Sequence, residues 1–234
     1  KEAAFTVLGS IALHGLRLSE TTLGSKVVVI GLGVIGQLVC RLAEAQGSEV
    51  TGIDPDPERS KNRDNFFTSA NDAELRDVDT VIITAATSSN EPIELATKIA
   101  RNKAKIVVVG DIPLNISRND FYYKELELVV SKSYGPGRYD KQYEALGNDY
   151  PIEYVRWTEN RNFEAFTNLL SQKQIHLLDL VSEEIAFEDA PSVYKKFDNE
   201  IKPLSVVLRY NIDAEPKIEM ANDLESEPRT SKVN

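Results

Sequence analysis

The chain has few residues that supply covalent or metal chemistry. Its 234 residues include one cysteine, one methionine, one tryptophan and two histidines. A single cysteine, Cys40, excludes an internal disulfide and fits a reducing compartment. Cys40 lies within an apolar helical run, which favours burial over reactivity. One cysteine and the two distant histidines, His14 and His176, do not make a zinc cluster, so we predict no metal site in this chain.

Positive charge and long apolar runs are also scarce. The chain carries 27 Lys and Arg against 37 Asp and Glu, a formal net charge of −10. Nucleic acids and anionic membranes both require a cationic surface, so neither is an expected partner. No apolar run approaches the roughly 18–20 residues of a membrane span, and no signal-peptide pattern opens the chain. We therefore expect a cytoplasmic protein, whose start at Lys1 suggests a piece of something larger.

From its start to about residue 140 the chain alternates helix-like and strand-like segments. The expected helices are 2–18, 34–46, 54–61, 91–103 and 117–125, and the expected strands are 26–30, 49–54, 79–86, 104–111 and 126–134. Alternation at this spacing requires right-handed crossovers and a parallel sheet. The pattern predicts an α/β fold, a doubly wound parallel Rossmann sheet with helices on both faces.

After residue 140 the rhythm changes. We expect strands at 152–158, 180–190 and 204–210, and helices at 162–174, with Asn162 as a possible cap, and at 191–199. From Asn211 onward the segment is polar and acidic. The expected domains are a dinucleotide-binding domain with a leading helix (1–140), a C-terminal α/β return segment (141–210) and an acidic linker or disordered tail (211–234).

The stretch "VVVIGLGVIGQLV" (27–39) places three glycines at G-x-G-x-x-G spacing between a predicted strand and a predicted helix. Gly31 permits a tight turn, Gly33 lets the backbone approach a pyrophosphate, and Gly36 lets helix and strand pack closely. Phosphates would lie at the helix N-terminus, where free N–H groups and the helix dipole favour anions. The candidate pyrophosphate residues are Gly31, Leu32, Gly33, Val34, Ile35 and Gly36. The alternative is a glycine turn with no ligand.

Asp54 follows Gly36 by 18 residues, at the end of the second predicted strand. A carboxylate there can accept both ribose hydroxyls of an adenosine and repel a 2′-phosphate, which favours NAD over NADP. Arg59 is close enough to Asp54 in sequence that NADP remains an alternative cofactor.

Open α/β sheets bind ligands beyond the carboxyl ends of their strands. That rule nominates two further groups of cofactor-contacting residues, Thr84, Ala85 and Ala86 after one strand and Gly110, Asp111 and Ile112 after another. Small residues also end strands without a functional reason, so that alternative stays open. Arg138, Tyr139 and Asp140 are candidate cleft residues, with a charged loop as the slightly favoured interpretation.

No residue is a convincing catalyst of hydride transfer. None of the nine tyrosines stands in a Tyr-x-x-x-Lys pattern. His14 falls on the apolar leading helix and His176 in "QIHLLDL", where packing or surface roles are favoured. The catalytic residues are therefore expected outside these 234 positions.

Five stretches resemble the cofactor domain of zinc-type medium-chain alcohol and polyol dehydrogenases: residues 2–59, 78–87, 105–113, 121–140 and 168–197. The resemblance implies an NAD-dependent oxidoreductase acting on CH–OH groups of an alcohol or sugar, and a homo-oligomer formed through the Rossmann domain. "SYGPGRYD" (133–140) is most similar to a subgroup from polysaccharide and nucleotide-sugar contexts, some members of which continue into a Gfo/Idh/MocA-type domain.

The chain departs from that family in two ways. The GroES-like domain that carries the family's zinc ligands is missing, so zinc is expected only on that absent domain, toward which the C-terminal segment would pack. The stretch between Asp54 and Asp79 is short, so either the crossover is trimmed, with "NFFTS" (65–69) as a vestigial third strand, or residues are absent. The alternative functions are a non-catalytic dinucleotide-binding redox sensor, and an assembly subunit that binds no cofactor.

Overall fold

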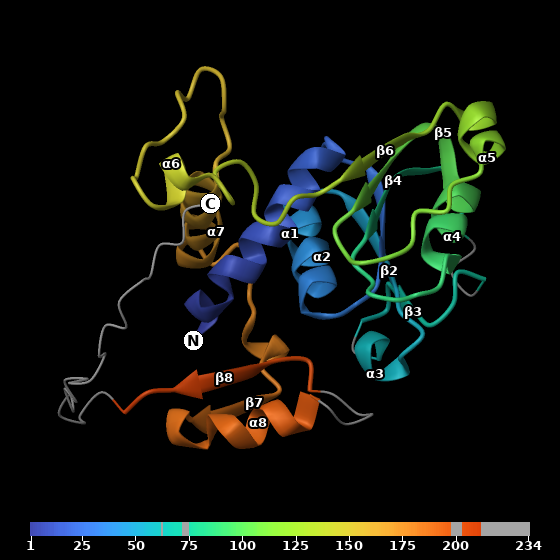
Figure 1. The fold of residues 1–234 in the computed structure, drawn as a ribbon. Coiled ribbons are helices and arrows are strands. Elements are labelled where there is room, and N and C mark those ends of the chain that lie inside the picture. Colours follow the sequence, from blue (N-terminus) through green and yellow to red (C-terminus); the bar gives the residue numbers. More distant parts are fainter. Residues whose placement is uncertain (62, 72–74, 198–202, 212–234) are drawn as a thin grey trace, which may run out of the picture.

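A six-stranded sheet organises the protein. The computed structural model describes residues 1–61, 63–71, 75–197 and 203–211 (Figure 1). The strands are β1 (Lys26–Ile30), β2 (Glu49–Ile53), β3 (Phe66–Phe67), β4 (Val78–Ile83), β5 (Ala100–Val108) and β6 (Glu127–Val130). Their order is β3-β2-β1-β4-β5-β6 and every pair is parallel. The order reverses between β1 and β4, which is where doubly wound sheets bind ligands.

Helices cover both faces of this sheet. The first face carries α1 (Thr6–Ser19), which follows a 3₁₀ turn at Glu2–Phe5, with α2 (Val34–Ala45) and α7 (Glu159–Ser171). The second face carries α4 (Glu91–Ile99) and α5 (Arg118–Lys124). Val27 and Val29 point into the first core, and Val28 and Ile30 into the second. Because β1 is buried on both faces, its sequence is an unbroken apolar run. The sheet order and the helices on both faces confirm the predicted doubly wound Rossmann architecture.

The crossover from β2 to β4 is trimmed. The helix after β2 is a single turn, α3 (Pro57–Ser60), and β3 is two residues long. Phe66 pairs with Gly52, and Phe67 with Ile53. A short third strand therefore lies within "NFFTS" (65–69), as the first of the two readings predicts.

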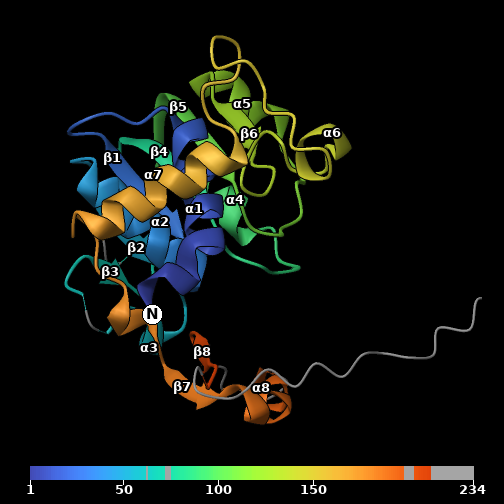
Figure 2. The ribbon, with the colours of Figure 1, turned by 90° about the vertical axis from the view of Figure 1, so that its left-hand side faces the viewer.

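The C-terminal segment forms a separate small unit. Strands β7 (Glu183–Ala186) and β8 (Val206–Arg209) pair in parallel, and α8 (Ala190–Phe197) connects them. Short 3₁₀ turns at Leu178–Leu180 and Phe187–Asp189 flank β7. Both views place this unit apart from the six-stranded sheet (Figures 1 and 2). The domain limits at residues 140 and 210 stay predictions, and the predicted tail, apart from Asn211, lies outside the described residues.

Two sequence predictions of local structure are wrong. Residues 152–158 form turns and bends rather than a strand, because the guanidinium of Arg161 fastens this loop by donating to the Tyr150 carbonyl at 2.8 Å and to the Asp149 carboxylate at 2.7 Å. The following helix begins at Glu159, with Thr158 as N-cap. Asn162 therefore lies inside α7 rather than capping it.

The β4–β5 connection also differs from expectation. The predicted helix 91–103 ends at Ile99, and β5 begins at Ala100. The pairing of β4 with β5 is irregular between Val78 and Thr80, and Lys103 adopts a left-handed φ of 61°. The chain therefore turns in the middle of this segment, which an apolar pattern does not reveal.

Cys40 is fully buried in α2, as predicted. Burial, and then the neighbouring Glu44 charge, raise the pKa of its thiol to about 12. We expect no reaction of the native protein with Ellman's reagent at pH 8, and release of one equivalent of chromophore in denaturant. Rapid labelling of the native protein would contradict this packing.

Among the described residues no helix has the length and apolarity to cross a bilayer.

Candidate functional site

The three glycines of the loop between β1 and α2 have different surroundings. Gly31 has a left-handed φ of 98°, and a Cβ there would lie 2.5 Å from the Ala85 nitrogen. A Cβ on Gly36 would lie 1.9 Å from the Gly31 oxygen. At Gly33 the nearest atom to a Cβ would be Nη1 of Arg59, at 3.9 Å. Gly31 and Gly36 are therefore required by packing, whereas Gly33 faces open space.

The N-terminus of α2 lacks a side-chain cap. Gly33 is its N-cap residue and supplies no side chain, and the helix runs for 12 residues. Within the described part of the chain, no group outside α2 accepts a hydrogen bond from the amides of Gly33, Val34 and Ile35. Inside α2 these amides also lack an acceptor, because the first turn of a helix has no preceding carbonyl. Free amides and the positive end of the helix dipole make this loop a suitable cradle for an anion.

Asp54 holds the glycine loop in place. The residue is 4% exposed, and its Oδ2 accepts the Leu32 amide at 2.7 Å. Its Oδ1 accepts the Asp56 amide at 2.9 Å. The Leu32 side chain is fully buried in the core, so Leu32 contributes to the loop through its backbone. A carboxylate has about four acceptor positions, so Asp54 retains capacity for further donors.

Arg59 lies across the same loop. Its Nη1 is 3.2 Å from Oδ2 of Asp54, and its Nε is 3.4 Å from Oδ2 of Asp56. Gln37 of α2 donates to the Arg59 carbonyl at 3.1 Å, which ties α3 to α2. The Arg59 side chain is 38% exposed, and it is the atom group nearest to the open side of Gly33. A guanidinium beside an anion cradle is available to a phosphate.

The predicted residues after β4 and β5 meet the glycine loop at the carboxyl edge of the sheet. Thr84 Oγ1 donates to the Gly31 carbonyl at 2.5 Å, and the Ala85 amide donates to Ile30 at 3.1 Å. A Cβ on Gly110 would lie 2.0 Å from the Ala85 oxygen. Close packing of three strand ends is therefore one reason for small residues here.

The remaining three predicted positions differ from one another. Ala86 and Asp111 are exposed, and the Asp111 carbonyl accepts the Thr87 amide at 3.0 Å. Ile112 is 9% exposed, and its side chain belongs to the core of the second face. Its backbone is therefore the part that remains available to a ligand.

Arg138 and Asp140 are engaged within their own loop. Arg138 forms an ion pair with Glu144, and this contact is the first cause of the lowered pKa of the Glu144 carboxyl. Asp140 caps the short helix α6 (Lys141–Glu144) and accepts the Tyr150 hydroxyl. Tyr139 is 65% exposed. The charged-loop interpretation fits these contacts better than a cleft.

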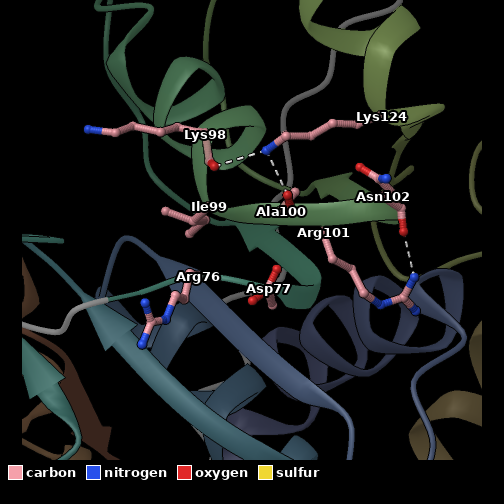
Figure 3. Close-up of a pocket in the computed structure, with 8 residues that line it drawn as sticks. All are labelled: Arg76, Asp77, Lys98, Ile99, Ala100, Arg101, Asn102 and Lys124. Carbon is pink, nitrogen blue, oxygen red and sulfur yellow. Dashed lines mark hydrogen bonds between the residues drawn. The ribbon is translucent and has the colours of Figure 1, made fainter.

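A separate pocket of about 420 Å³ opens at the end of the sheet where the strands begin, opposite the carboxyl end that carries the glycine loop. It lies beside the start of β4 and the start of β5, and is lined by Arg76, Asp77, Lys98, Ile99, Ala100, Arg101, Asn102 and Lys124 (Figure 3). The Lys124 amine donates to the carbonyls of Thr97, Lys98 and Ala100 at the end of α4. The side chains of Arg76, Lys98 and Arg101 point in different directions, so these cations do not converge on one ligand (Figure 3).

One family model matches residues 16–111, that of DUF364, described as "Putative heavy-metal chelation". The match covers the sheet from α1 to the end of β5 and less than half of the chain. Across the described ranges no group of three or more His, Cys, Asp or Glu residues is placed to hold a metal ion. The matched segment thus contains the glycine loop and no recognisable chelating cluster among those residues.

The chain is similar to known dehydrogenases. It is 25% identical, over 91% of its length, to 2-dehydro-3-deoxy-L-galactonate 5-dehydrogenase of Pseudoalteromonas atlantica, and it covers 59% of that protein. It aligns over 88% of its length with the crystal structure of galactitol-1-phosphate dehydrogenase from Escherichia coli, at a TM-score of 0.69 and 23% identity, covering 59% of that chain. The chain therefore spans about three fifths of the relatives that it matches.

Two further solved structures carry a nicotinamide cofactor. A protein described as a "putative zinc-binding dehydrogenase" from Sinorhizobium meliloti, bound to NADP, aligns at a TM-score of 0.66 and 20% identity, over 88% of this chain and 58% of its own. A short chain alcohol dehydrogenase from E. coli complexed with NADH aligns at 0.67 and 18%, over 87% and 58%. The chain thus shares its fold with dehydrogenases of alcohols and polyols.

Proposed function

We propose that this chain is the cofactor-binding part of an NAD-dependent dehydrogenase that oxidises an alcohol or sugar substrate by hydride transfer. One observation carries the proposal: the uncapped N-terminus of α2, with the open side of Gly33 before it and Asp54 beside it. A loop that only turned the chain would not need a bare Gly33, because nothing lies within 3.9 Å of a Cβ there.

Each part of the loop has a separate task in this proposal. The amides of Gly33, Val34 and Ile35 hold the pyrophosphate, and the dipole of α2 favours its charge. Asp54 keeps the loop in shape through Leu32 and offers its remaining acceptor capacity to the adenosine ribose. NAD supplies the hydride acceptor, and the ends of β4 and β5 limit the space around it.

The substrate and the catalytic residues belong to the proposal for the whole protein. The relatives named above act on a sugar acid and a sugar-alcohol phosphate according to their names, which suggests a polyol or sugar derivative here. We propose that the substrate, and zinc where it takes part, bind to a GroES-like domain against which the β7–β8 unit packs. Membership of the subgroup from polysaccharide contexts remains a prediction, and so does a following Gfo/Idh/MocA-type domain. Both depend on the resemblance of "SYGPGRYD" (133–140).

Titration calorimetry with NADH tests the proposal and separates it from an assembly role. We expect saturable binding by the wild-type chain, because the glycine loop and Asp54 both belong to this chain. Asp54→Asn removes the charge but retains one oxygen and should weaken NADH binding by about 1–2 kcal/mol. Absence of binding at millimolar NADH would rule out the cofactor-domain function, while binding by the full-length protein without turnover of any polyol would favour the redox-sensor alternative.

Arg59 sets how strictly the site distinguishes the two cofactors. Asp54 disfavours a 2′-phosphate, but Arg59 neutralises part of that charge at 3.2 Å. We expect NADH to bind more tightly than NADPH, and Arg59→Gln to weaken NADPH more than NADH, by a further factor of about ten. Equal effects of Arg59→Gln on both cofactors would assign Arg59 to the pyrophosphate instead.

Self-association through the Rossmann domain is also a proposal. β6 is an edge strand, and Val130 at its end is 60% exposed. An edge strand offers unpaired backbone groups to a second copy of the same strand. Sedimentation equilibrium of the chain, compared with a variant in which Val130 is replaced by lysine, distinguishes a dimer formed at this edge from a monomer.

A further inference from the structure

The only tryptophan of the sequence lies between two arginines. The guanidinium carbon of Arg17 is 3.3 Å from the centre of the Trp157 ring, and that of Arg156 is 3.9 Å from it. Two guanidinium groups this close to one ring centre would overlap on a single face, so they lie on opposite faces of the indole. We name Arg17, Trp157 and Arg156 the Arg–Trp–Arg cluster.

The cluster is held from within the fold. Arg17 belongs to α1, and its Nε donates to Oδ1 of Asn162 at 2.9 Å. Asn162 is fully buried in α7, and its amide nitrogen donates to the Tyr134 carbonyl at 3.0 Å. This chain of contacts fixes the Arg17 guanidinium and leaves both of its Nη atoms without a hydrogen bond to any described residue.

Among the described residues, no carboxylate forms an ion pair with Arg17 or Arg156. Burial, and then the Arg156 charge, lower the pKa of Arg17 to about 10. The protein thus maintains two like charges near one ring at an electrostatic cost, and an anion at the edge of the ring, within reach of both guanidinium groups, would reduce that cost.

The start of α7 lies next to the cluster. Trp157 directly precedes Thr158, the N-cap residue of this 13-residue helix. The Glu159 amide donates to the Pro136 carbonyl at 2.9 Å and the Asn160 amide to the Tyr143 hydroxyl at 3.2 Å, so the helix end itself offers neither amide to a ligand. Thr158 is fully buried, and its Oγ1 has no hydrogen-bond partner. The opposing group is Glu159, which is 9% exposed, and burial raises the pKa of its carboxyl. A carboxyl shifted toward its neutral form opposes an incoming anion less.

We propose that the Arg–Trp–Arg cluster binds an oxyanion of phosphate type at the edge of the indole. An oxyanion presents several oxygens at once and can accept from the guanidinium groups on both faces of the ring. The site is distinct from the glycine loop, because its residues come from α1 and from the loop before α7. The proposed oxyanion site therefore does not depend on whether the chain binds a dinucleotide.

Fluorescence of Trp157 reports on this site alone, because the chain has no other tryptophan. We expect inorganic phosphate to change the emission saturably in the millimolar range, at an ionic strength held constant with sodium chloride. The same titration with citrate and with acetate distinguishes a site for phosphate from a site that binds carboxylates in general. Arg156→Gln should weaken phosphate binding about tenfold or more, because one charged donor is lost.

Two further variants make the result decisive. Arg118→Gln is the matched control, because Arg118 also lies over an aromatic ring, Tyr122, at 4.5 Å, and we expect unchanged phosphate binding. Arg17→Lys keeps the charge but loses the planar fork, and an intermediate affinity is expected. An emission that follows chloride and phosphate equally, or an Arg156→Gln variant that binds phosphate like the wild type, would overturn the proposal.

Discussion

Gly36→Ala is expected to unfold part of the glycine loop between β1 and α2 and to remove NADH binding. The added Cβ would lie 1.9 Å from the Gly31 carbonyl oxygen and 2.7 Å from Oγ1 of Thr84. Both neighbours are fixed, because Thr84 donates to that same carbonyl. α2 must therefore move away from the end of β1, at a cost of about 2–3 kcal/mol in the free energy of unfolding. Urea denaturation measures this loss, and calorimetry measures the binding.

Gly33→Ala is the informative partner of that variant. Gly33 has an ordinary φ of −64°, and its Cβ would meet only Arg59 at 3.9 Å. Because alanine is a poorer N-cap residue than glycine, the free energy of unfolding should fall by no more than about 1 kcal/mol, less than in Gly36→Ala. NADH binding should nevertheless fall about tenfold or more, because the methyl group keeps a phosphate from the free amides. Full NADH affinity in Gly33→Ala would contradict the placement of the pyrophosphate at this loop.

Phe166→Ala should lower the free energy of unfolding by about 3–5 kcal/mol, because truncation of a buried ring leaves a large cavity. Phe166 is fully buried in α7. Its ring packs directly on the backbone of α1 at Gly9, where a Cβ would lie 2.1 Å from the ring. The same contact holds α7 against α1, which also carries Arg17. Loss of the ring therefore loosens one whole layer of the first face.

Chemical denaturation measures the effect, with Tyr154→Ala as the control. Tyr154 is 87% exposed, so its removal should change the free energy of unfolding by less than about 0.5 kcal/mol. A two-state transition shifted by only about 1 kcal/mol in Phe166→Ala would show that α7 contributes little to the main core.

The doubly wound class of the sheet was largely predictable from the sequence. Val27 to Ile30 form an apolar run because both faces of β1 are covered, and a run of that kind identifies a central parallel strand. The glycine spacing and the position of Asp54 depend on local geometry around one turn. These features are short-range, so the residues themselves carry them.

Other features depended on partners far away in the chain. The stretch 152–158 has the composition of a strand, yet Arg161 holds it as a loop by bonds to Asp149 and Tyr150. The shared role of Asp54, as anchor of Leu32 and partner of Arg59, also required the folded loop. Neither arrangement has a periodic signature in the sequence.

The sequence by itself therefore determined the doubly wound class and the glycine loop between β1 and α2, because hydrophobic period and turn chemistry act over a few residues. The tertiary structure alone decided that β3 survives as two residues, that Arg59 lies across Gly33, and that Arg17 meets Trp157 from another helix. Contacts between residues separated by many positions form only when helices and strands pack, and no local pattern encodes them.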